Sequence, residues 1–306
     1  MNSPLFSSDR NRPLLEIAIE KMVGLTSAPA HDSVAIEEPL EIQLAYGTVD
    51  ARAVKSITVT MRTPGHDSEL AAGFLLTEGV VRDAADITRI LNPLGETEND
   101  EPAPSAGTDS FFSHPSRLNV VRVELDPDVE VNMSSLERNF YTTSSCGICG
   151  KASLLALRSV CPPRFPNYFS IQAEILHTLP ERLRNAQRVF DRTGGLHGAG
   201  LFDSTGQLLM LREDVGRHNA VDKLLGAQFL ADNTPLRDKL LLLSGRVSFE
   251  LLQKAVMAGL PMVAAVGAPS SLAVQVATEF DITLIGFLRD NRFNVYHGGD
   301  RVRPGL

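Results

Sequence analysis

The sequence predicts an α/β protein whose C-terminal part holds a mostly parallel sheet covered by helices on both faces. Three short apolar runs, residues 240–243, 262–266 and 282–287, alternate with two segments of helical periodicity. Strands buried on both faces show such continuous apolar runs, and consecutive parallel strands are joined by helices. Ligands of such sheets bind at the carboxyl ends of the strands, so a site is expected there.

The composition of the chain limits its partners. It has 306 residues, of which 43% are hydrophobic and 22% charged, and its net charge is −8. A broad nucleic-acid surface would need clustered Lys and Arg, so we expect no nucleic-acid partner. No run approaches the roughly 20 apolar residues of a membrane span, and the N-terminus shows no secretory pattern. We therefore expect a cytoplasmic protein without a membrane partner.

Residues 34–140 are expected to form a smaller N-terminal α+β domain, after a flexible N-terminus over residues 1–33. Alternating apolar residues predict strands at 40–44 and 57–61. A helix is predicted over 69–77, with Asp67 as its cap.

Two less regular segments follow. Residues 92–116 are acidic and rich in Pro and Gly, which predicts a mobile loop before strand character returns at 120–123. Residues 141–170 hold the close cysteine pair in a run of small residues and form the linker to the next domain.

The C-terminal domain is expected over residues 171–306. Besides the three apolar strands, its predicted elements are a helix from Pro180 to just before Gly194, a hairpin over 201–211, and helices over 219–230, 249–258 and 271–280.

Cys146 and Cys149 are the first candidates for chemistry, because two intervening residues let both sulfurs reach one atom or each other. The pair could carry sulfur as a persulfide, cycle between dithiol and disulfide, or supply half of a zinc site. Packed structural cysteines are the alternative, but the Ser, Thr and Gly neighbours offer few apolar contacts.

Zinc is the weakest of these readings, since Cys161 is alone and the histidines are scattered. A thioredoxin-like centre would follow a strand in a small βαβ unit, whereas this pair lies in a loop in the middle of the chain. Lys151 and the start of a following helix would favour the thiolate, the form that attacks a donor persulfide. These features favour a sulfur carrier.

A charged run over residues 212–223 is the second candidate. It can be read as a solvated helix start capped by Asp214, or as a ligand contact after a strand, with Gly216 allowing close backbone approach. The contact residues would be Arg217, His218 and Asn219. His197 lies among glycines and could form a pocket wall, although a lone His is more often structural.

Polar residues follow each of the apolar strands, where backbone N–H groups and cations could hold an anion. An ordinary helix cap or solvated loop is the alternative at each position taken alone. Together they suggest a nucleotide-like or phosphorylated ligand. The residues are Ser244, Gly245, Arg246, Ser270, Phe287, Leu288, Arg289, Asp290, Asn291 and Arg292.

These segments together resemble the FdhD/NarQ family of formate dehydrogenase accessory sulfurtransferases. The matching segments run in the expected order from about residue 34 to residue 296, and the acidic loop is an insertion. They are residues 61–67, 73–79, 146–149, 197–199, 213–223, 244–246 and 286–292.

The resemblance implies a function that the composition of the chain could not indicate. Family members take sulfur from a cysteine desulfurase and pass it to the molybdenum or tungsten bis-pterin guanine dinucleotide cofactor of formate dehydrogenase. The persulfide residue falls on Cys146, with Cys149 as its assistant, and the guanine dinucleotide stretch falls on residues 287–292. GDP would then serve as a surrogate ligand.

The resemblance also implies a homodimer and a C-terminal three-layer domain similar to cytidine deaminase, without its zinc. The sequence agrees in lacking a His-x-Glu before a Pro-Cys-x-x-Cys. Two other functions stay open: a chaperone that only binds the cofactor, for which the cysteines would be dispensable, and a deaminase-like hydrolase, for which bound zinc would be required.

Overall fold

The structure is a computed structural model that describes residues 12–93, 119–131, 154, 157, 158, 161 and 166–305. Cys146 and Cys149 lie outside the described residues, as does most of the predicted acidic loop. Among the helices that are described, none is long and apolar enough to cross a membrane.

The N-terminal unit is a four-stranded sheet covered by helix α1 (Asp67–Thr77), in the strand order β4-β3-β6-β5. Its strands are β3 (Glu38–Tyr46), β4 (Ala53–Arg62), β5 (Ile87–Leu91) and β6 (Val120–Leu125), with a 3-10 turn at Ala84–Asp86 before β5. The predicted strands and helix are confirmed here. Asp67 does not cap the helix: His66 holds the cap position with φ 60°, and the Asp67 carboxylate binds Arg62.

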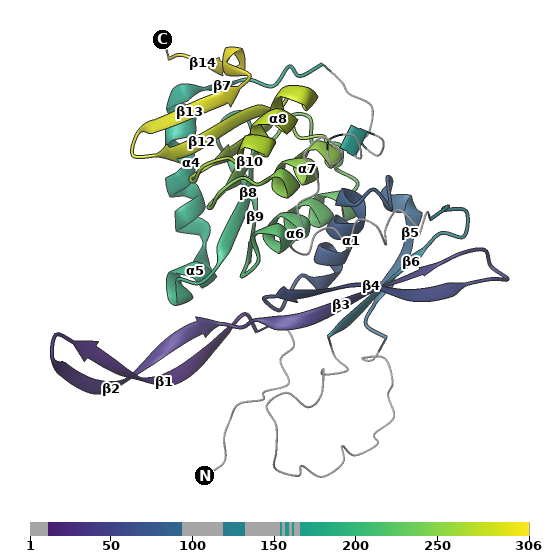
Figure 1. Cartoon of the computed structure of the whole chain (residues 1–306), viewed down its shortest axis with the longest axis horizontal. Coiled ribbons are helices and arrows are strands. Elements are labelled where there is room, and N and C mark those ends of the chain that lie inside the picture. Colours follow the sequence, from purple (N-terminus) through teal and green to yellow (C-terminus); the bar gives the residue numbers. More distant parts are fainter. Residues whose placement is uncertain are drawn as a thin grey trace.

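A two-stranded hairpin precedes this unit, formed by β1 (Leu14–Val23) and β2 (Thr26–Ala35). The prediction of a flexible segment up to residue 33 is therefore wrong from Leu14 onward. Leu15, Ile17 and Ile19 alternate with Glu16, Ala18 and Glu20 as in a strand, but the small and polar composition of the segment outweighed this signal in the prediction. Cross-strand pairing with β2 supplies the order that composition does not show. Figure 1 shows the hairpin reaching away from the rest of the chain.

The C-terminal unit is built on a six-stranded sheet in the order β13-β12-β11-β10-β8-β9. The strands are β8 (His197–Phe202), β9 (Leu208–Asp214), β10 (Leu240–Leu243), β11 (Met262–Ala265), β12 (Thr283–Arg289) and β13 (Arg292–His297). A separate small pair joins β7 (Ile171–Gln172) to β14 (Val302–Arg303), next to a 3-10 turn at Gly299–Arg301.

The prediction of a mostly parallel sheet is wrong. Only β10–β11 and β11–β12 pair in parallel, whereas β10–β8, β8–β9 and β12–β13 are antiparallel. Short turns join β8 to β9 and β12 to β13, and a short connection can only return the chain antiparallel. The sheet is mixed, with the predicted parallel strands at its centre.

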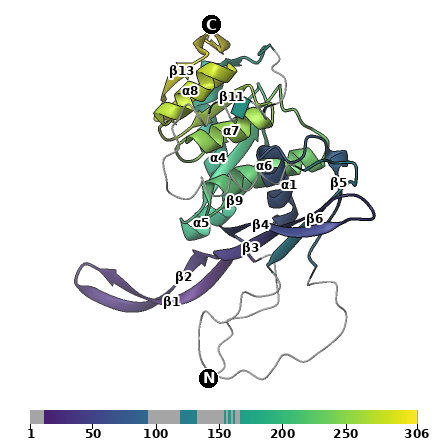
Figure 2. The same cartoon turned by 45° about the vertical axis from the view of Figure 1, so that its right-hand side comes forward.

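Helices cover both faces of this sheet in three layers, as expected (Figures 1 and 2). Alternate residues of the strands pack against α6 (Arg217–Leu230), α7 (Phe249–Met257) and α8 (Ser271–Phe280) on one face. The opposite set packs against α4 (Ala173–Ala186), which continues into α5 (Arg188–Thr193). The finer likeness to cytidine deaminase stays a prediction.

Helix α4 begins seven residues before the predicted start at Pro180, which lies inside it. Leu176, Leu179 and Leu183 are fully or almost fully buried on one side of the helix. Burial of three leucines at helical spacing outweighs the roughly 3 kcal/mol that an internal proline costs.

The two units meet where α1 crosses α6 with their backbones in contact. A Cβ atom placed on Gly226 would lie 1.8 Å from the carbonyl oxygen of Glu69, and one on Gly73 would lie 1.9 Å from that of Asp222. Beside this crossing, the buried Lys254 ammonium lies 2.8 Å from a carboxylate oxygen of Asp222. The Asp222 carboxylate also accepts a hydrogen bond from the Thr77 hydroxyl. The relative position of the units is therefore fixed by backbone shape and buried charge.

Candidate functional site

The predicted strand-end residues meet at one edge of the six-stranded sheet. Strands β10, β11 and β12 all end at this edge, and β8 begins there because it runs antiparallel to β10. The Ser244 hydroxyl accepts a hydrogen bond of 2.9 Å from Gly198 N, which ties the end of β10 to the beginning of β8. His197 therefore lies beside Gly245, whose Cβ position would be 3.4 Å from its Nδ1 atom.

Cationic side chains surround His197 at this edge. Burial, together with the charges of Arg217 and Arg246, lowers the pKa of His197. Burial is also the largest cause that lowers the pKa of His218 to about 4, followed by the charges of Lys254 and Arg217. Both imidazoles are therefore neutral near pH 7, and the two arginines are the groups that could bind an anion.

Arg217 has a buried hydrogen-bond donor that a ligand could use. Its Nε atom is buried and finds no hydrogen-bond partner among the described residues. A buried N–H without a partner costs about 1–3 kcal/mol, which an incoming acceptor would remove. Phosphate oxygens are such acceptors, so this part of the edge fits a phosphorylated ligand.

Bare backbone lines the neighbouring strand ends. A Cβ atom on Gly267 would lie 2.8 Å from the carbonyl oxygen of Gly245, so the chain cannot carry a side chain there. Ser270 follows on the next connection, but its hydroxyl accepts a hydrogen bond from Ala273 N and caps α8. The sequence left open whether Ser270 is a cap or a ligand; the structure shows the cap.

The β12–β13 hairpin continues beyond the same edge and presents the predicted guanine-binding stretch. Phe287, Asp290 and Asn291 have φ values of 54°, 53° and 52°, which curl the strand end into a tight turn. The Arg289 guanidinium lies 6.0 Å from the centre of the Phe287 ring, and Arg292 is exposed. Leu288 is fully buried against the α4 layer, so its side chain anchors the hairpin.

The charged run at 212–223 divides between two tasks. Arg217 and His218 face the sheet edge, and His218 lies 3.4 Å from the Ser248 hydroxyl. Asn219 instead donates to the carbonyl of Met61 at 2.7 Å and accepts from the Thr60 hydroxyl at 3.1 Å. Its side chain therefore joins α6 to β4, and its ligand contact stays a prediction.

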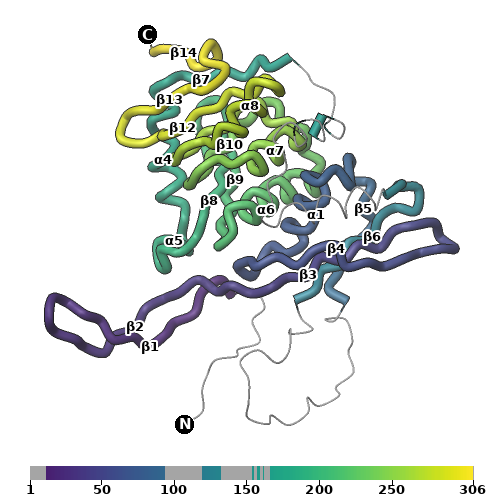
Figure 3. The backbone as a smooth tube through the Cα atoms, in the orientation of Figure 1, coloured from purple at the N-terminus to yellow at the C-terminus, as the bar shows by residue number. Residues whose placement is uncertain are grey.

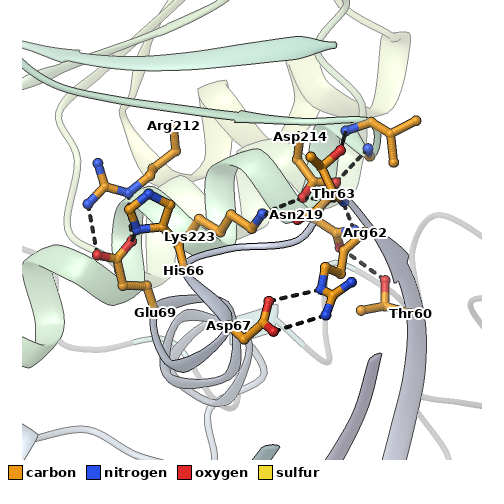
Figure 4. Close-up of polar contacts among 12 residues, drawn as sticks. Thr60, Arg62, Thr63, His66, Asp67, Glu69, Arg212, Asp214, Asn219 and Lys223 are labelled. Atoms are coloured by element: carbon orange, nitrogen blue, oxygen red, sulfur yellow. Dashed lines mark hydrogen bonds and ion pairs between the residues drawn. The ribbon is translucent and has the colours of Figure 1, made fainter. Parts of the chain in front are cut away.

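Asp214 is the centre of a buried network that joins the units (Figure 4). Its carboxylate lies 2.7 Å from the Lys223 ammonium and accepts hydrogen bonds from Thr63 N and Gly216 N. Lys223 also donates to the carbonyl of Thr63 at 2.7 Å. The sequence left open whether Asp214 caps the helix or lies in a ligand-contacting run, and it missed this role because Thr63 lies about 150 residues earlier.

A second group of residues lines a cavity of about 350 Å³ between the units, which sequence reasoning did not predict. In Figure 4, Glu69 of α1 reaches Arg212 of β9 on one side and His66 on the other. Burial alone would raise the pKa of Glu69, but hydrogen bonds and charge from Arg212 and His66 prevail and lower it to about 2. The signals in the sequence were the motif over residues 61–67, which contains His66, and the charged run over 212–223, which contains Arg212.

Acid should weaken this contact between the units. The folded pKa of Glu69, about 2, lies below the ordinary value of 4.5, so its stabilisation is present above pH 4.5 and is lost as pH falls through about 2. The free energy of unfolding by urea should therefore differ more between wild type and Glu69→Gln at pH 5 than at pH 2.5. Exposed Glu37→Gln is the control and should show no such change; an equal difference at both pH values for Glu69→Gln would contradict the assignment.

Comparison with known proteins gives the family. The model of the FdhD/NarQ family matches residues 35–303. This chain belongs to the FdhD/NarQ family. Within the described part of the chain, no group of three or more His, Cys, Asp or Glu side chains is arranged to hold a metal ion.

Similar proteins agree with this assignment. The chain is 50% identical over 273 residues to the sulfur carrier protein FdhD of Streptomyces coelicolor, covering 89% of each chain. It is 38% identical over 287 residues to the protein of that name from Sulfurisphaera tokodaii, covering 94% and 98%. A crystal structure from Desulfotalea psychrophila, described as a formate dehydrogenase accessory protein, has the same fold. It matches with TM-score 0.69 and 22% identity over 95% of this chain and all of that one.

Proposed function

We propose that this protein is a sulfur carrier that moves persulfide sulfur from a cysteine desulfurase to the molybdenum or tungsten bis-pterin guanine dinucleotide cofactor of formate dehydrogenase. Family membership and relatives named sulfur carrier protein support the role. The observation that supports a bound nucleotide is the unpartnered Arg217 Nε atom beside Arg246 at the sheet edge. The partners are the desulfurase and the catalytic subunit of formate dehydrogenase.

Sulfur acceptance is a balanced exchange. The Cys146 thiolate attacks the outer sulfur of the desulfurase persulfide, the donor S–S bond breaks, and the donor cysteine leaves as a thiolate. Cys146 then holds the extra sulfur as its own persulfide. Attack by the Cys149 thiolate on the inner sulfur would release hydrosulfide to the metal and leave a disulfide, which a thiol reductant returns to the dithiol.

The cofactor is a substrate in this scheme, held through its nucleotide end. Arg217, Arg246 and the backbone at Gly245 would contact phosphates, and residues 287–292 would contact the guanine. This division follows the chemistry of the donors, because guanidinium groups pair with phosphate oxygens and the aromatic Phe287 offers a face for stacking.

Loading is the direct test of the proposal. The full chain is incubated with a cysteine desulfurase and cysteine, and mass spectrometry without reductant should show the gain of one sulfur atom in the peptide that holds Cys146. Absence of that gain, with an active desulfurase, would exclude a persulfide carrier. The chaperone alternative predicts GDP binding without loading.

Nucleotide binding is expected to depend on the edge arginines. Calorimetry with GDP should give a dissociation constant about tenfold or more higher for Arg246→Ala and for Arg289→Ala, because a hydrogen bond to a charged group contributes about 1.5–3 kcal/mol. Exposed Arg303 belongs to β14, next to the 3-10 turn whose Arg301 binds Thr283 at the opposite end of β12. Arg303→Ala should leave the affinity unchanged, and equal losses in all three variants would refute the site.

A further inference from the structure

Thr63, the residue directly after β4, holds the segment that leads into α6, although it belongs to the other unit. Its backbone N–H donates to the Asp214 carboxylate at 3.1 Å. Its hydroxyl oxygen accepts a hydrogen bond from Val215 N at 3.1 Å, and its carbonyl accepts one from the Lys223 ammonium at 2.7 Å. Three polar groups of one buried residue thus contact α6 and the residues before it.

The segment from Asp214 to Gly216 depends on this contact for its shape. Gly216 occupies the N-cap position of α6, where it has no side chain that could bind the first N–H groups of the helix. The Asp214 carboxylate folds the segment back by accepting a hydrogen bond from Gly216 N at 2.8 Å. A Cβ atom on Gly216 would lie 2.8 Å from Nδ2 of Asn219, so the turn is tightly packed. Between these points, the Val215 N–H is held by Thr63.

Arg217 comes directly after this segment, as the first residue of α6. Its Nε atom stays buried at the sheet edge without a hydrogen-bond partner among the described residues. A long side chain such as that of arginine escapes this situation by rotating toward solvent, unless the backbone that carries it is fixed. The direction of the guanidinium therefore depends on how firmly residues 214–216 are held.

Thr63 is itself held in place from the N-terminal unit. Arg62, the last residue of β4, is buried and donates two hydrogen bonds to the Asp67 carboxylate, at 2.9 and 3.0 Å, and one to Asn119 at 3.1 Å. Bidentate pairs of this kind fix the planar guanidinium in one orientation. Helices α1 and α6 lie side by side where the units meet, with their backbones in contact (Figure 3). The backbone at Thr63 therefore has little freedom to move relative to α6.

We infer that Thr63 is a positioning residue for the nucleotide: through Asp214 and Val215, the N-terminal unit sets the orientation of Arg217 at the sheet edge. The inference rests on the proposed nucleotide site and adds a residue that contributes to binding without touching the ligand. An arginine held in its binding orientation before the ligand arrives loses less conformational entropy on binding. Both units thereby determine the affinity for the nucleotide, although its contacts come from the C-terminal one.

Calorimetry with GDP on the full chain tests this role. Thr63→Val keeps the shape of the side chain but removes the acceptor of Val215 N. It should raise the dissociation constant about tenfold, because one hydrogen bond contributes about that factor to an equilibrium. Thr63→Ser keeps the hydroxyl and should bind as wild type does. Thr77→Val is the matched control: it removes a buried hydroxyl from the other polar contact between the units, with Asp222, and should leave the affinity unchanged.

A double-mutant cycle shows whether Thr63 acts through Arg217. Arg217→Ala should weaken GDP binding by itself, and adding Thr63→Val should then cause no further loss. Hydrogen–deuterium exchange of the peptide over residues 214–218 gives a second readout, without ligand. Exchange there should be faster in Thr63→Val and unchanged in Thr63→Ser and Thr77→Val.

The outcomes separate this inference from the proposed function. If wild type binds GDP and Thr63→Val binds it equally well, the positioning role alone is overturned, as it is by a full loss from Thr63→Val in the Arg217→Ala background. A wild type that does not bind GDP would refute the nucleotide site and the inference with it. All variants are compared below the lowest melting temperature of the set. Thr77→Val, which also loses a buried hydrogen bond, distinguishes a loss of stability from a loss of orientation.

Discussion

Replacing Cys146 with alanine is expected to abolish sulfur loading completely. The thiolate is the nucleophile of the exchange, and no other group in the proposed step can take its place. The measurement is mass spectrometry of the intact chain and its peptides after incubation with a cysteine desulfurase. The loss should be total, because the variant lacks the atom that forms the new S–S bond.

The other two cysteines provide the controls. Cys161→Ala should load as wild type does, since Cys161 lies partly buried against the helical core and its Sγ atom is directed to the carbonyl of Arg158. Cys149→Ala should load normally but release sulfur more slowly. Loading retained in Cys146→Ala would refute the assignment. A Cys149→Ala variant that is fully active in releasing sulfur would remove the proposed role of that residue.

Substitution of Gly226 by alanine is expected to destabilise the protein by at least about 3 kcal/mol. In an isolated helix, the same change would stabilise by up to about 1 kcal/mol, because alanine favours the helix more than glycine does. The crossing with α1 reverses that sign, since the new Cβ would lie 1.8 Å from the Glu69 carbonyl and 2.5 Å from Gly73 N. Both of those neighbours are backbone atoms, which cannot move without separating the helices.

Urea denaturation of wild type and Gly226→Ala measures this effect directly. Gly73→Ala should behave similarly, because its Cβ would meet the Asp222 carbonyl at 1.9 Å. Gly195→Ala is the matched control: its nearest neighbours would lie at 3.8 Å, an ordinary contact, so its free energy of unfolding should stay close to that of wild type. A Gly226→Ala protein as stable as wild type would show that the two backbones are not in contact.

The alternation of apolar strands and helices in the C-terminal part was readable because each element carries its own periodicity. Strands β10 and β11 and helices α7 and α8 lie within a residue or two of their predicted bounds. The convergence of Ser244 and Gly245 with the ends of β11 and β12 followed from the predicted parallel strands, whereas His197 joins them because β8 runs antiparallel to β10, which the sequence did not predict. The direction of β13, and the pairing of β1 with β2 before residue 34, could not be predicted from the sequence. Periodicity gives neither the partner nor the direction of a strand.

The sequence by itself determined the central strands and the helices after them in the C-terminal unit, and the polar residues that follow those strands, since both depend on local spacing. The tertiary structure alone decided the tasks within the run 212–223. Asp214 and Lys223 form hydrogen bonds with the backbone of Thr63, and Asn219 with that of Met61, because polar groups buried between two units need hydrogen-bond partners. Those partners lie at the end of β4 or directly after it, about 150 residues earlier in the chain, and no pattern in the run itself could predict them.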